Sequence, residues 1–396
     1  MAVELKKDIY WVGVVDWALR HFHGQELSTH RGSSYNAYLI RDQKNVLVDT
    51  VWEPFAEEFI ANLRKEIDLA KIDYIIANHA EPDHSGAMPA LMRFCPNATI
   101  VLSKRGMDSI PGHYHQPWKF QVVGTGDTLN IGRRELRFIE ATMLHWPDTM
   151  FTYVAGDNIL LSNDAFGQHY ATAFRWNDQV DQAELFQEAI KYYANILTPY
   201  SKQVTKKIEE FAALNWPVDM ICPSHGVLWR DNPMQIVHKY LEWAAQKGEK
   251  RAVIVFDTMW NATRKMAEAV GAGLTERGVP NKLFYMAVSD HNDVVTEILR
   301  SKAVVIGSPT HNRGLLPSIM PILEDIRGLK FQNKVGAAFG SYGWAAESVK
   351  LLEEHLAQSG IPLAAPGVLA KWQPTDDDLA KCRQLGYAVA DAVNKE

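Results

Sequence analysis

A seven-residue stretch, Asn78 to His84, constrains the fold more than any other part of the sequence. Within six positions it holds four potential metal ligands: His79, Glu81, Asp83 and His84. They follow a mostly apolar run, 72–77, which predicts a buried strand. A strand delivers the residues after it to one fixed place, and Pro82 is expected to turn the chain and spread their side chains. The stretch therefore predicts a metal-binding loop at a sheet edge, the alternative being a polar loop with incidental histidines.

The same order, an apolar strand and then a potential ligand, recurs three times. His145 follows the run 138–144, Asp164 follows 158–162, and His225 follows 218–222. One such histidine is more often structural, but the repetition indicates a shared site. Together with the first four ligands, these side chains can hold two metal ions about 3.5 Å apart. An aspartate between two cations can bridge them, because each carboxylate oxygen can bind one ion.

Other polar residues near these motifs receive smaller roles. His113 and His115 alternate between two prolines without a carboxylate, which predicts an ordinary surface loop. His169 is a candidate for supporting Asp164, and Asp148 for orienting His145.

The N-terminal half predicts a β-rich chain with helices in between. A strand is expected at 9–15, a hairpin from 36–40 and 45–49, a helix at 57–67, and a second helix from about 85 to 93. Further short strands are expected at 99–102, 122–123, 128–131 and 136–140. This order suggests two sheets that are covered by helices.

A charged connector, 247–251, precedes a different pattern, so we divide the chain into domains 1–249 and 250–396. Residues 252–256 form a continuous apolar run, as in a parallel sheet buried on both faces. Strands and helices then alternate, with strands expected at 282–287, 303–307 and 334–339 and helices at 264–274, 294–300 and 319–326. Such alternation implies a doubly wound parallel sheet with ligands at the strand C-termini.

Three loops at those C-termini can bind a cofactor. The first offers hydroxyls, an amide and free backbone N–H groups at a helix N-terminus, which suits a phosphate. The other two can hydrogen-bond the edge of a flavin, and Trp344 can lie against its ring. The loop residues are Thr258, Met259, Trp260, Asn261, Ala262 and Thr263, then Ser308, Pro309, Thr310, His311 and Asn312, then Gly340, Ser341, Tyr342, Gly343 and Trp344. No Gly-x-Gly-x-x-Gly or Gly-Lys-Ser/Thr motif is present, so dinucleotides and nucleoside triphosphates are weak candidates.

Composition narrows the class further. The net charge of −6 provides no basic field for nucleic acid. No stretch approaches about 18 apolar residues, so neither a membrane span nor export is expected. The three cysteines, Cys95, Cys222 and Cys382, are scattered without a Cys-x-x-Cys pair, which excludes a rubredoxin-type or zinc-ribbon site in this sequence. Low cysteine use fits the cytoplasm.

The ligand motif resembles that of the flavodiiron proteins, which carry a diiron site on a metallo-β-lactamase-like αββα fold. Hydrolases of that fold usually have His-x-His-x-Asp-His, and this chain has Glu81 at the position of the second histidine. A carboxylate there favours iron over zinc, because it is a hard, anionic oxygen ligand.

By that resemblance, one iron would be bound by His79, Glu81, His145 and Asp164, and the other by Asp83, His84, His225 and the same Asp164. The family varies in whether the histidine at position 84 is coordinated. The resemblance also makes His23 and Tyr193 candidates for lining the substrate pocket, with local packing as the alternative.

The three loops of the second half resemble the FMN site of flavodoxins. The usual Thr-x-Thr-Gly-x-Thr is altered here, because Trp260 and Asn261 replace the second threonine and the glycine. The resemblance implies FMN and two iron ions as cofactors, and reduction of O₂ to water or of NO to N₂O. It also implies electrons from rubredoxin or a similar carrier, and a head-to-tail homodimer or a dimer of such dimers.

Two other functions fit parts of the pattern. A binuclear zinc hydrolase fused to a flavodoxin module would share the ligand spacing, but Glu81 argues against it. An electron-transfer flavoprotein with a purely structural metal site is the other, although structural sites are usually closed by their ligands.

Overall fold

The computed structural model describes residues 2–395, which divide into two compact units. The first unit contains the chain up to Tyr192 together with Tyr200–Leu241, and the second contains Tyr193–Pro199 and the chain from Glu242 onward. The boundary predicted from sequence, 249/250, lies at the start of a strand, β17 (Glu249–Phe256). The charged connector is therefore partly the polar end of that strand.

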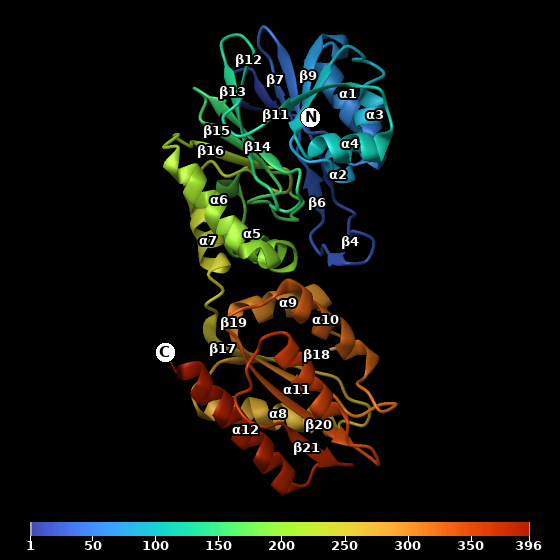
Figure 1. Ribbon diagram of the computed structural model, residues 1–396, viewed down its shortest axis with the longest axis vertical. Helices are drawn as coiled ribbons and strands as arrows, with labels where there is room; N and C mark the ends of the chain where they lie inside the picture. The colour runs from blue at the N-terminus through green and yellow to red at the C-terminus, as the bar shows by residue number, and fades with distance from the viewer. Residues whose placement is uncertain (1, 396) are drawn as a thin grey trace. The chain divides into compact units, whose positions relative to one another are not determined.

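The first unit is built on two sheets (Figure 1). The seven-stranded sheet has the order β1-β2-β7-β8-β9-β10-β11, with strands Val3–Lys6, Ile9–Trp11, Tyr38–Ile40, Asn45–Val48, Ile72–Ala77, Thr99–Ser103 and Lys119–Val123. The five-stranded sheet runs from β12 to β16, with strands Thr128–Asn130, Glu135–Glu140, Met150–Ala155, Ile159–Asn163 and Met220–Pro223. Short ribbons pair β3 (Val14–Asp16) with β6 (Ser33–Tyr35), and β4 (His21–Phe22) with β5 (Leu27–Ser28).

The inner faces of the two sheets form a continuous apolar core. Ile76 and Val101 from the first sheet pack in one cluster with Phe138, Val154 and Leu161 from the second. Helices cover the outer faces: α1 (Ala56–Glu66), α3 (Met88–Leu91) and α4 (Gly106–Tyr114) lie beside the first sheet, and α5 (Gln182–Tyr192), α6 (Ser201–Ala213) and α7 (Met234–Ala244) lie on the side of the second (Figure 1). The predicted αββα sandwich is thus confirmed.

Strand direction brings several loops to one edge of the second sheet. β13 and β15 both pair antiparallel with β14, so they run in the same direction, and β16 pairs parallel with β15. All three strands therefore end at one edge. The first sheet joins it there, because the Met150 amide of β14 donates to the carbonyl of Asn78 just after β9.

The prediction of local structure was wrong in two places near this edge. The expected turn at Pro82 is a short helix, α2 (Pro82–Ser85), and α3 is separate from it, so no continuous helix spans 85–93. Proline is favoured in the first turn of a helix, where its missing N–H has no partner to lose. The strand expected at 9–15 is also divided, into β2 and β3.

The second unit is a five-stranded parallel sheet in the order β18-β17-β19-β20-β21, which confirms the doubly wound flavodoxin-like topology. Its other strands are Asn281–Tyr285, Ser301–Gly307, Val335–Tyr342 and Val368–Lys371, and its helices are α8 (Ala262–Glu276), α9 (His291–Arg300), α10 (Met320–Leu329), α11 (Ser348–Gln358) and α12 (Asp376–Asn394). Helices α8 and α12 pack closely at Gly273 and Gly386, where a Cβ would lie 2.2 Å and 2.3 Å from backbone oxygens of the facing helix.

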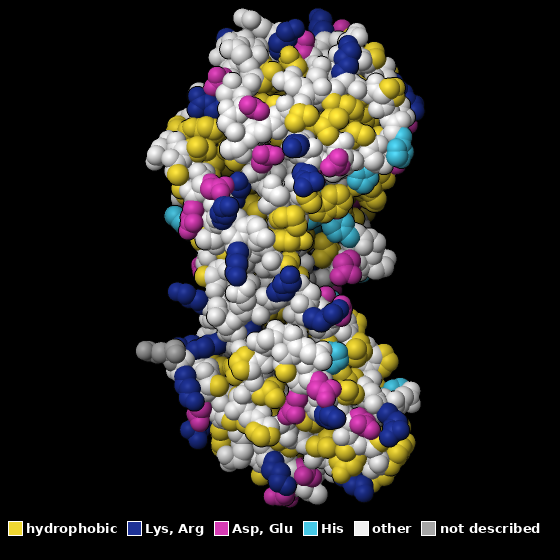
Figure 2. Space-filling model, viewed as in Figure 1, with side chains coloured by type: hydrophobic (Ala, Val, Ile, Leu, Met, Phe, Trp, Pro, Cys, Tyr) yellow, Lys and Arg dark blue, Asp and Glu magenta, His cyan; other side chains and the backbone are white. Residues whose placement is uncertain are grey.

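Surface charge has no dominant sign in the displayed view. Basic and acidic side chains are interspersed on the visible face of each unit (Figure 2). Among residues 2–395, none of the helices combines the length and the apolar character that crossing a bilayer requires.

Candidate metal centre and flavin cleft

Two buried groups of potential ligands lie at the edge where β9, β13, β15 and β16 end. In the first group, His79, Glu81, His145 and Asp164 each offer an atom within 4.8 Å of the others. The second group, Asp83, His84 and His225, meets the same limit. The seven residues predicted from sequence as metal ligands are therefore brought together.

Asp164 stands between the two groups and faces each with a different oxygen. Its Oδ2 lies 3.7 Å from His79 Nε2 and 3.4 Å from His145 Nε2. Its Oδ1 lies 3.0 Å from His84 Nε2 and 3.4 Å from His225 Nε2. This is the arrangement that a bridging carboxylate requires.

The short helix α2 separates the ligands of the first stretch into the two groups. Glu81 is the residue before the helix, and its Oε2 lies 3.2 Å from both His79 Nε2 and His145 Nε2. Asp83, inside the helix, turns to the other side, with Oδ2 3.0 Å from His225 Nε2. The Ser85 hydroxyl donates to the Ala80 carbonyl at 2.6 Å and holds this tight turn closed.

Two observations show that this cluster fits metal ions. Several buried ligand atoms, among them Asp83 Oδ1, His84 Nε2 and Asp164 Oδ2, have no hydrogen-bond partner, although buried polar atoms normally have one. The nitrogen–oxygen separations of 3.0–3.7 Å are also suitable, because ligands about 2 Å from a shared ion lie roughly 3–3.5 Å apart.

Electrostatics point the same way. Burial alone would lower the pKa of His145, but the carboxylates of Asp164 and Glu81 raise it to about 9. Burial likewise opposes charge on His225, yet Asp164 and Asp83 raise its pKa to about 10. The carboxylates of Glu81, Asp83 and Asp164 therefore stabilise positive charge on the neighbouring histidines. Metal ions can supply that positive charge in place of protons.

Contacts behind the ligands fix the orientation of two rings. Asp148 Oδ2 lies 3.2 Å from His79 Nδ1 and also accepts the Ala80 amide at 2.7 Å. The prediction that Asp148 orients His145 was therefore wrong, and its partner is His79. The Nδ1–H of His225 donates to the Ser34 carbonyl at 2.8 Å, which leaves Nε2 to face the cluster.

Asp49 was not predicted from sequence as part of the site; it directly follows the strand β8 and is 2% exposed. It accepts hydrogen bonds from the Asn78 amide at 2.8 Å, from the Asn78 side chain at 3.2 Å and from the Asn163 side chain at 3.3 Å. These asparagines directly precede His79 and Asp164. An acidic residue straight after an apolar strand was the signal that identified the other ligands, and it applies to Asp49 too.

The predicted pocket residues have different surroundings. His23 Nε2 lies 2.7 Å from Glu81 Oε1, and its side chain is 34% exposed. Tyr193 contacts the Trp243 ring with centroids 5.5 Å apart. The hydroxyl that reaches the cluster belongs to the preceding residue, Tyr192, which donates to Asp164 Oδ1 at 3.1 Å. The geometry therefore favours Tyr192 in place of Tyr193.

Two other histidines differ from expectation, and His115 agrees with it. His169 was predicted to support Asp164, but its Nδ1 lies 2.9 Å from the Ser33 hydroxyl. Ser224, like Tyr192, donates to Asp164 Oδ1 at 3.1 Å. His113 is exposed, as predicted, but it belongs to the helix α4 and not to a loop, and it stacks on Trp146, whose ring in turn contacts His79. His115 follows that helix and is exposed.

In the second unit, the three predicted loops border one cleft with a volume of about 570 Å³. Most of the predicted residues line it: Thr258, Met259, Trp260, Ala262, Pro309, Thr310, His311, Asn312, Ser341, Tyr342, Gly343 and Trp344. The other four, Asn261, Thr263, Ser308 and Gly340, lie outside that lining. The buried hydroxyls of Thr263 and Ser341 lie 3.1 Å apart and join the first loop to the third.

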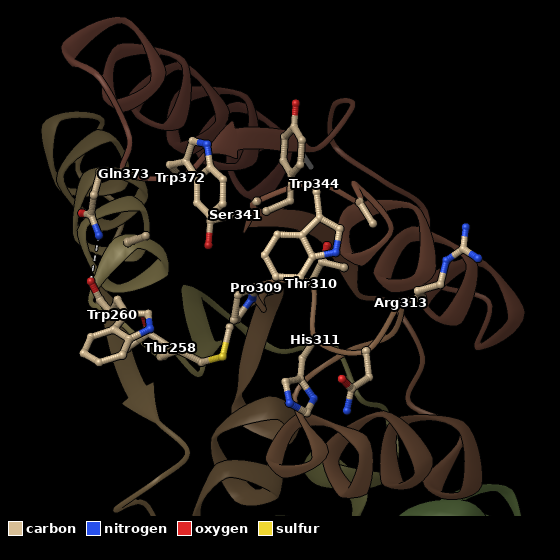
Figure 3. A pocket seen from close by; sticks show the side chains of 16 residues that line it. Thr258, Trp260, Pro309, Thr310, His311, Arg313, Ser341, Trp344, Trp372 and Gln373 are labelled. Carbon is tan, nitrogen blue, oxygen red and sulfur yellow. Dashed lines mark hydrogen bonds between the residues drawn. The ribbon is translucent and has the colours of Figure 1, made fainter.

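The cleft contains features that fit a flavin phosphate and ring. The Thr258 hydroxyl oxygen is buried and has no partner, so it can donate to a phosphate. Asn261 precedes α8 with φ of 62°, the left-handed conformation that asparagine tolerates. The rings of Trp260, Trp344 and Trp372 surround the opening (Figure 3).

Trp372 and Gln373 were not predicted from sequence. The Gln373 side chain donates to the Trp260 carbonyl at 2.9 Å, and a Cβ at Gly343 would lie 2.7 Å from the Trp372 ring. Both residues follow β21, far along the chain from the other loops, and no local motif marks them.

Comparisons with known proteins agree with both sites. Residues 34–226 match a model of the ODP family of beta lactamases, and residues 254–386 match flavodoxin. A nitric oxide reductase of Moorella thermoacetica is 50% identical over 390 residues, which cover 98% of each chain.

Solved structures are similar over nearly the whole length. Rubredoxin oxygen:oxidoreductase from Desulfovibrio gigas has a TM-score of 0.97 and 39% identity, with 99% of this chain and 98% of that chain covered. A flavodiiron protein from Giardia intestinalis has a TM-score of 0.95 and 35% identity, with 99% and 97% covered. The chain belongs to the flavodiiron protein family and is an oxidoreductase with a diiron site and FMN as its cofactors.

Proposed function

We propose that this flavodiiron protein reduces NO to N₂O in preference to reducing O₂ to water, at two irons held by the seven buried ligands. The observation that carries the chemistry is Asp164, which faces one ligand group with each carboxylate oxygen. When bound, a diiron pair and FMN together supply up to four electrons. That number suffices for one O₂ (4 e⁻ and 4 H⁺ give two H₂O) or for two NO (2 e⁻ and 2 H⁺ give N₂O and H₂O).

The preference for NO rests on the relatives. The protein from Moorella thermoacetica, 50% identical, is named a nitric oxide reductase, whereas the one from Desulfovibrio gigas, 39% identical, is named an oxygen oxidoreductase. Both share nearly full coverage with this chain, so the higher identity supports NO.

His79, Glu81, His145 and Asp164 would hold one iron, and Asp83, His84, His225 and Asp164 the other. Carboxylate and imidazole ligands suit non-haem iron. Around them, the chain's own groups orient the ligands: Tyr192 and Ser224 donate to Asp164 Oδ1, and Asp148 holds the His79 ring.

Both reactions consume protons, and His23 is positioned to deliver them. Its Nε2 contacts Glu81 Oε1 at the ligand cluster, while the side chain remains one-third exposed to solvent. A proton taken up at the exposed imidazole can therefore be held at the boundary of the cluster. Tyr192 acts as a hydrogen-bond donor to Asp164. Burial raises the pKa of its phenol well above the usual value, so the hydroxyl keeps its proton.

FMN would occupy the 570 Å³ cleft, with its phosphate at the 258–263 loop and its ring near Trp344. The exposed rings of Trp260, Trp344 and Trp372 leave the cleft rim apolar, which suits a covering protein surface. We assign that surface to a second copy in a head-to-tail homodimer, and the electron donor to rubredoxin or a similar small carrier. The three cysteines are buried and unpaired, in keeping with a reducing cytoplasm.

The substrate preference can be measured with an electrode. Iron- and FMN-replete protein, driven by reduced rubredoxin, should consume NO at a kcat/KM at least about tenfold above that for O₂, which corresponds to about 1.4 kcal/mol in transition-state stabilisation. N₂O should form with one molecule for every two NO. Faster uptake of O₂ would show that O₂ is the preferred substrate. If the protein consumed neither gas, the proposed function would be wrong.

Replacing the bridging ligand tests the metal assignment. Asp164→Ala should lose iron and lower turnover by more than about 100-fold, because even residues behind the ligands commonly contribute 10- to 100-fold. FMN content should stay at the wild-type level, since the cleft lies in the other unit. Iron is counted by mass spectrometry, and full iron with full turnover would disprove the bridging role.

A single charge tests the phosphate loop. Asn261→Asp should weaken FMN binding by about tenfold or more, because a carboxylate would repel the phosphate across a short distance. Asn261→Gly is the matched control, since glycine also adopts positive φ but adds no charge. Equal FMN affinity of the Asp and Gly variants, measured by fluorescence titration, would place the phosphate elsewhere.

Mixing the metal-site and FMN-site variants tests the dimer. In a head-to-tail dimer, the FMN of an Asp164→Ala chain serves the intact irons of an Asn261→Asp chain. Co-expression in equal amounts should therefore restore about a quarter of wild-type activity, since half the dimers are mixed and each has one of two sites. The assay is run at an FMN concentration that loads only chains with an intact loop. If electrons pass within one chain, the mixture stays inactive.

A further inference from the structure

A second cavity lies in the first unit, outside the metal cluster, between the second sheet and the helices α6 and α7. Its volume is about 430 Å³. The sheet contributes Phe151, Leu160 and Ile221 to its floor, and their strand neighbours Met150 and Leu161 face the core between the two sheets. The cavity is therefore the incompletely filled layer between the outer face of this sheet and its covering helices.

The lining offers no free polar anchor. Only Lys207 and Asn215 among the lining residues carry polar side-chain groups, apart from the indole N–H of Trp216. Lys207 Nζ is bonded to Glu210 Oε2 at 2.6 Å, and the Asn215 side chain donates to the Ala213 carbonyl at 3.1 Å. An apolar lining gives water few hydrogen-bond partners, and enclosed apolar cavities of only about 150 Å³ bind xenon or benzene.

Two residues of the cavity wall are close in sequence to metal ligands. Leu144 directly precedes the ligand His145, and Phe166 lies two residues after the ligand Asp164. Leu144 is 1% exposed and Phe166 is 4% exposed, so both form the inner wall. Other lining residues, Ala212, Asn215, Pro217 and Met234, are exposed, so the cavity opens to solvent there.

We infer that this cavity is a reservoir and entry route for the apolar diatomic substrate, NO or O₂, behind the His145 and Asp164 loops. The inference rests on the proposed function for the identity of the gas. Neither molecule needs a polar anchor, and both dissolve better in apolar surroundings than in water. A reservoir beside the ligands raises the local gas concentration when the dissolved gas is scarce.

Xenon binding tests whether the cavity takes up an apolar gas, and it does so independently of catalytic activity. Crystals of the iron- and FMN-loaded protein under xenon pressure should show xenon between α6 and the sheet. Val237→Phe, on the inner face of α7, should fill the cavity and remove that xenon, because Val237 is 7% exposed and lines it. The control is His238→Phe, which adds the same ring on the exposed side of the same helix.

Kinetics then tests the route. With iron and FMN contents unchanged, Val237→Phe should lower kcat/KM for the gas by at least about threefold while kcat at saturating gas changes less, and His238→Phe should match the wild type. If Val237→Phe does not retain both cofactors, Ile208→Phe from α6 replaces it.

Two results would overturn the inference. The first is the absence of xenon from the wild-type cavity, including the case in which a co-purified organic molecule fills it. The second is an unchanged kcat/KM in a variant that no longer binds xenon there. A protein that reduces neither gas would instead defeat the proposed function, and the xenon result would still report on the cavity.

Discussion

One buried carboxylate, Asp49, connects the segments that deliver the metal ligands from the two sheets. Its oxygens accept hydrogen bonds from Asn78 in the first sheet and Asn163 in the second, so it joins the two sheets where both deliver ligands. Burial raises the pKa of Asp49 to about 6, and the three donors stabilise its charged form. A buried acceptor that lost these donors would be costly, so the register of the two sheets is held at this point.

The ligand cluster concentrates negative charge that protonated histidines or metal ions can balance. Glu81, Asp83 and Asp164 are at most 7% exposed, and placing three carboxylates together in such surroundings is unfavourable without compensating charge. The unpartnered oxygens of Asp83 and Asp164 show that the protein's own donors do not complete that compensation. The same arrangement would give metal ions ligands that follow strands of both sheets, with Asp164 facing each ligand group.

The sequence predicted those parts of the fold and site that follow from local order along the chain. The run before His79 and the repeated strand-then-ligand pattern identified seven side chains that do meet, because parallel strand ends must share an edge. Predictions that needed the direction of a side chain were less successful. Asp148 orients His79 and not His145, because the end of the loop after β13 pairs with the segment after β9, where the Met150 amide donates to the Asn78 carbonyl. Tyr192 and Tyr193 are adjacent, and only the π-helical turn at the end of α5 determines which hydroxyl faces Asp164.

The flavin cleft contains residues, such as Trp372, that could not be predicted from the sequence. Its phosphate loop is continuous in sequence and carries its own signal, hydroxyls and an asparagine at the start of a helix. Trp372 follows β21, which pairs with β20 although the long segment containing α11 separates the two strands in sequence. Its place beside Gly343 is therefore a consequence of strand order in the sheet. The parallel sheet brings it to the opening because all its strands end on one side. A cofactor site at such an edge therefore contains residues that no local sequence motif identifies. Finding them requires knowledge of the order of the strands in the sheet.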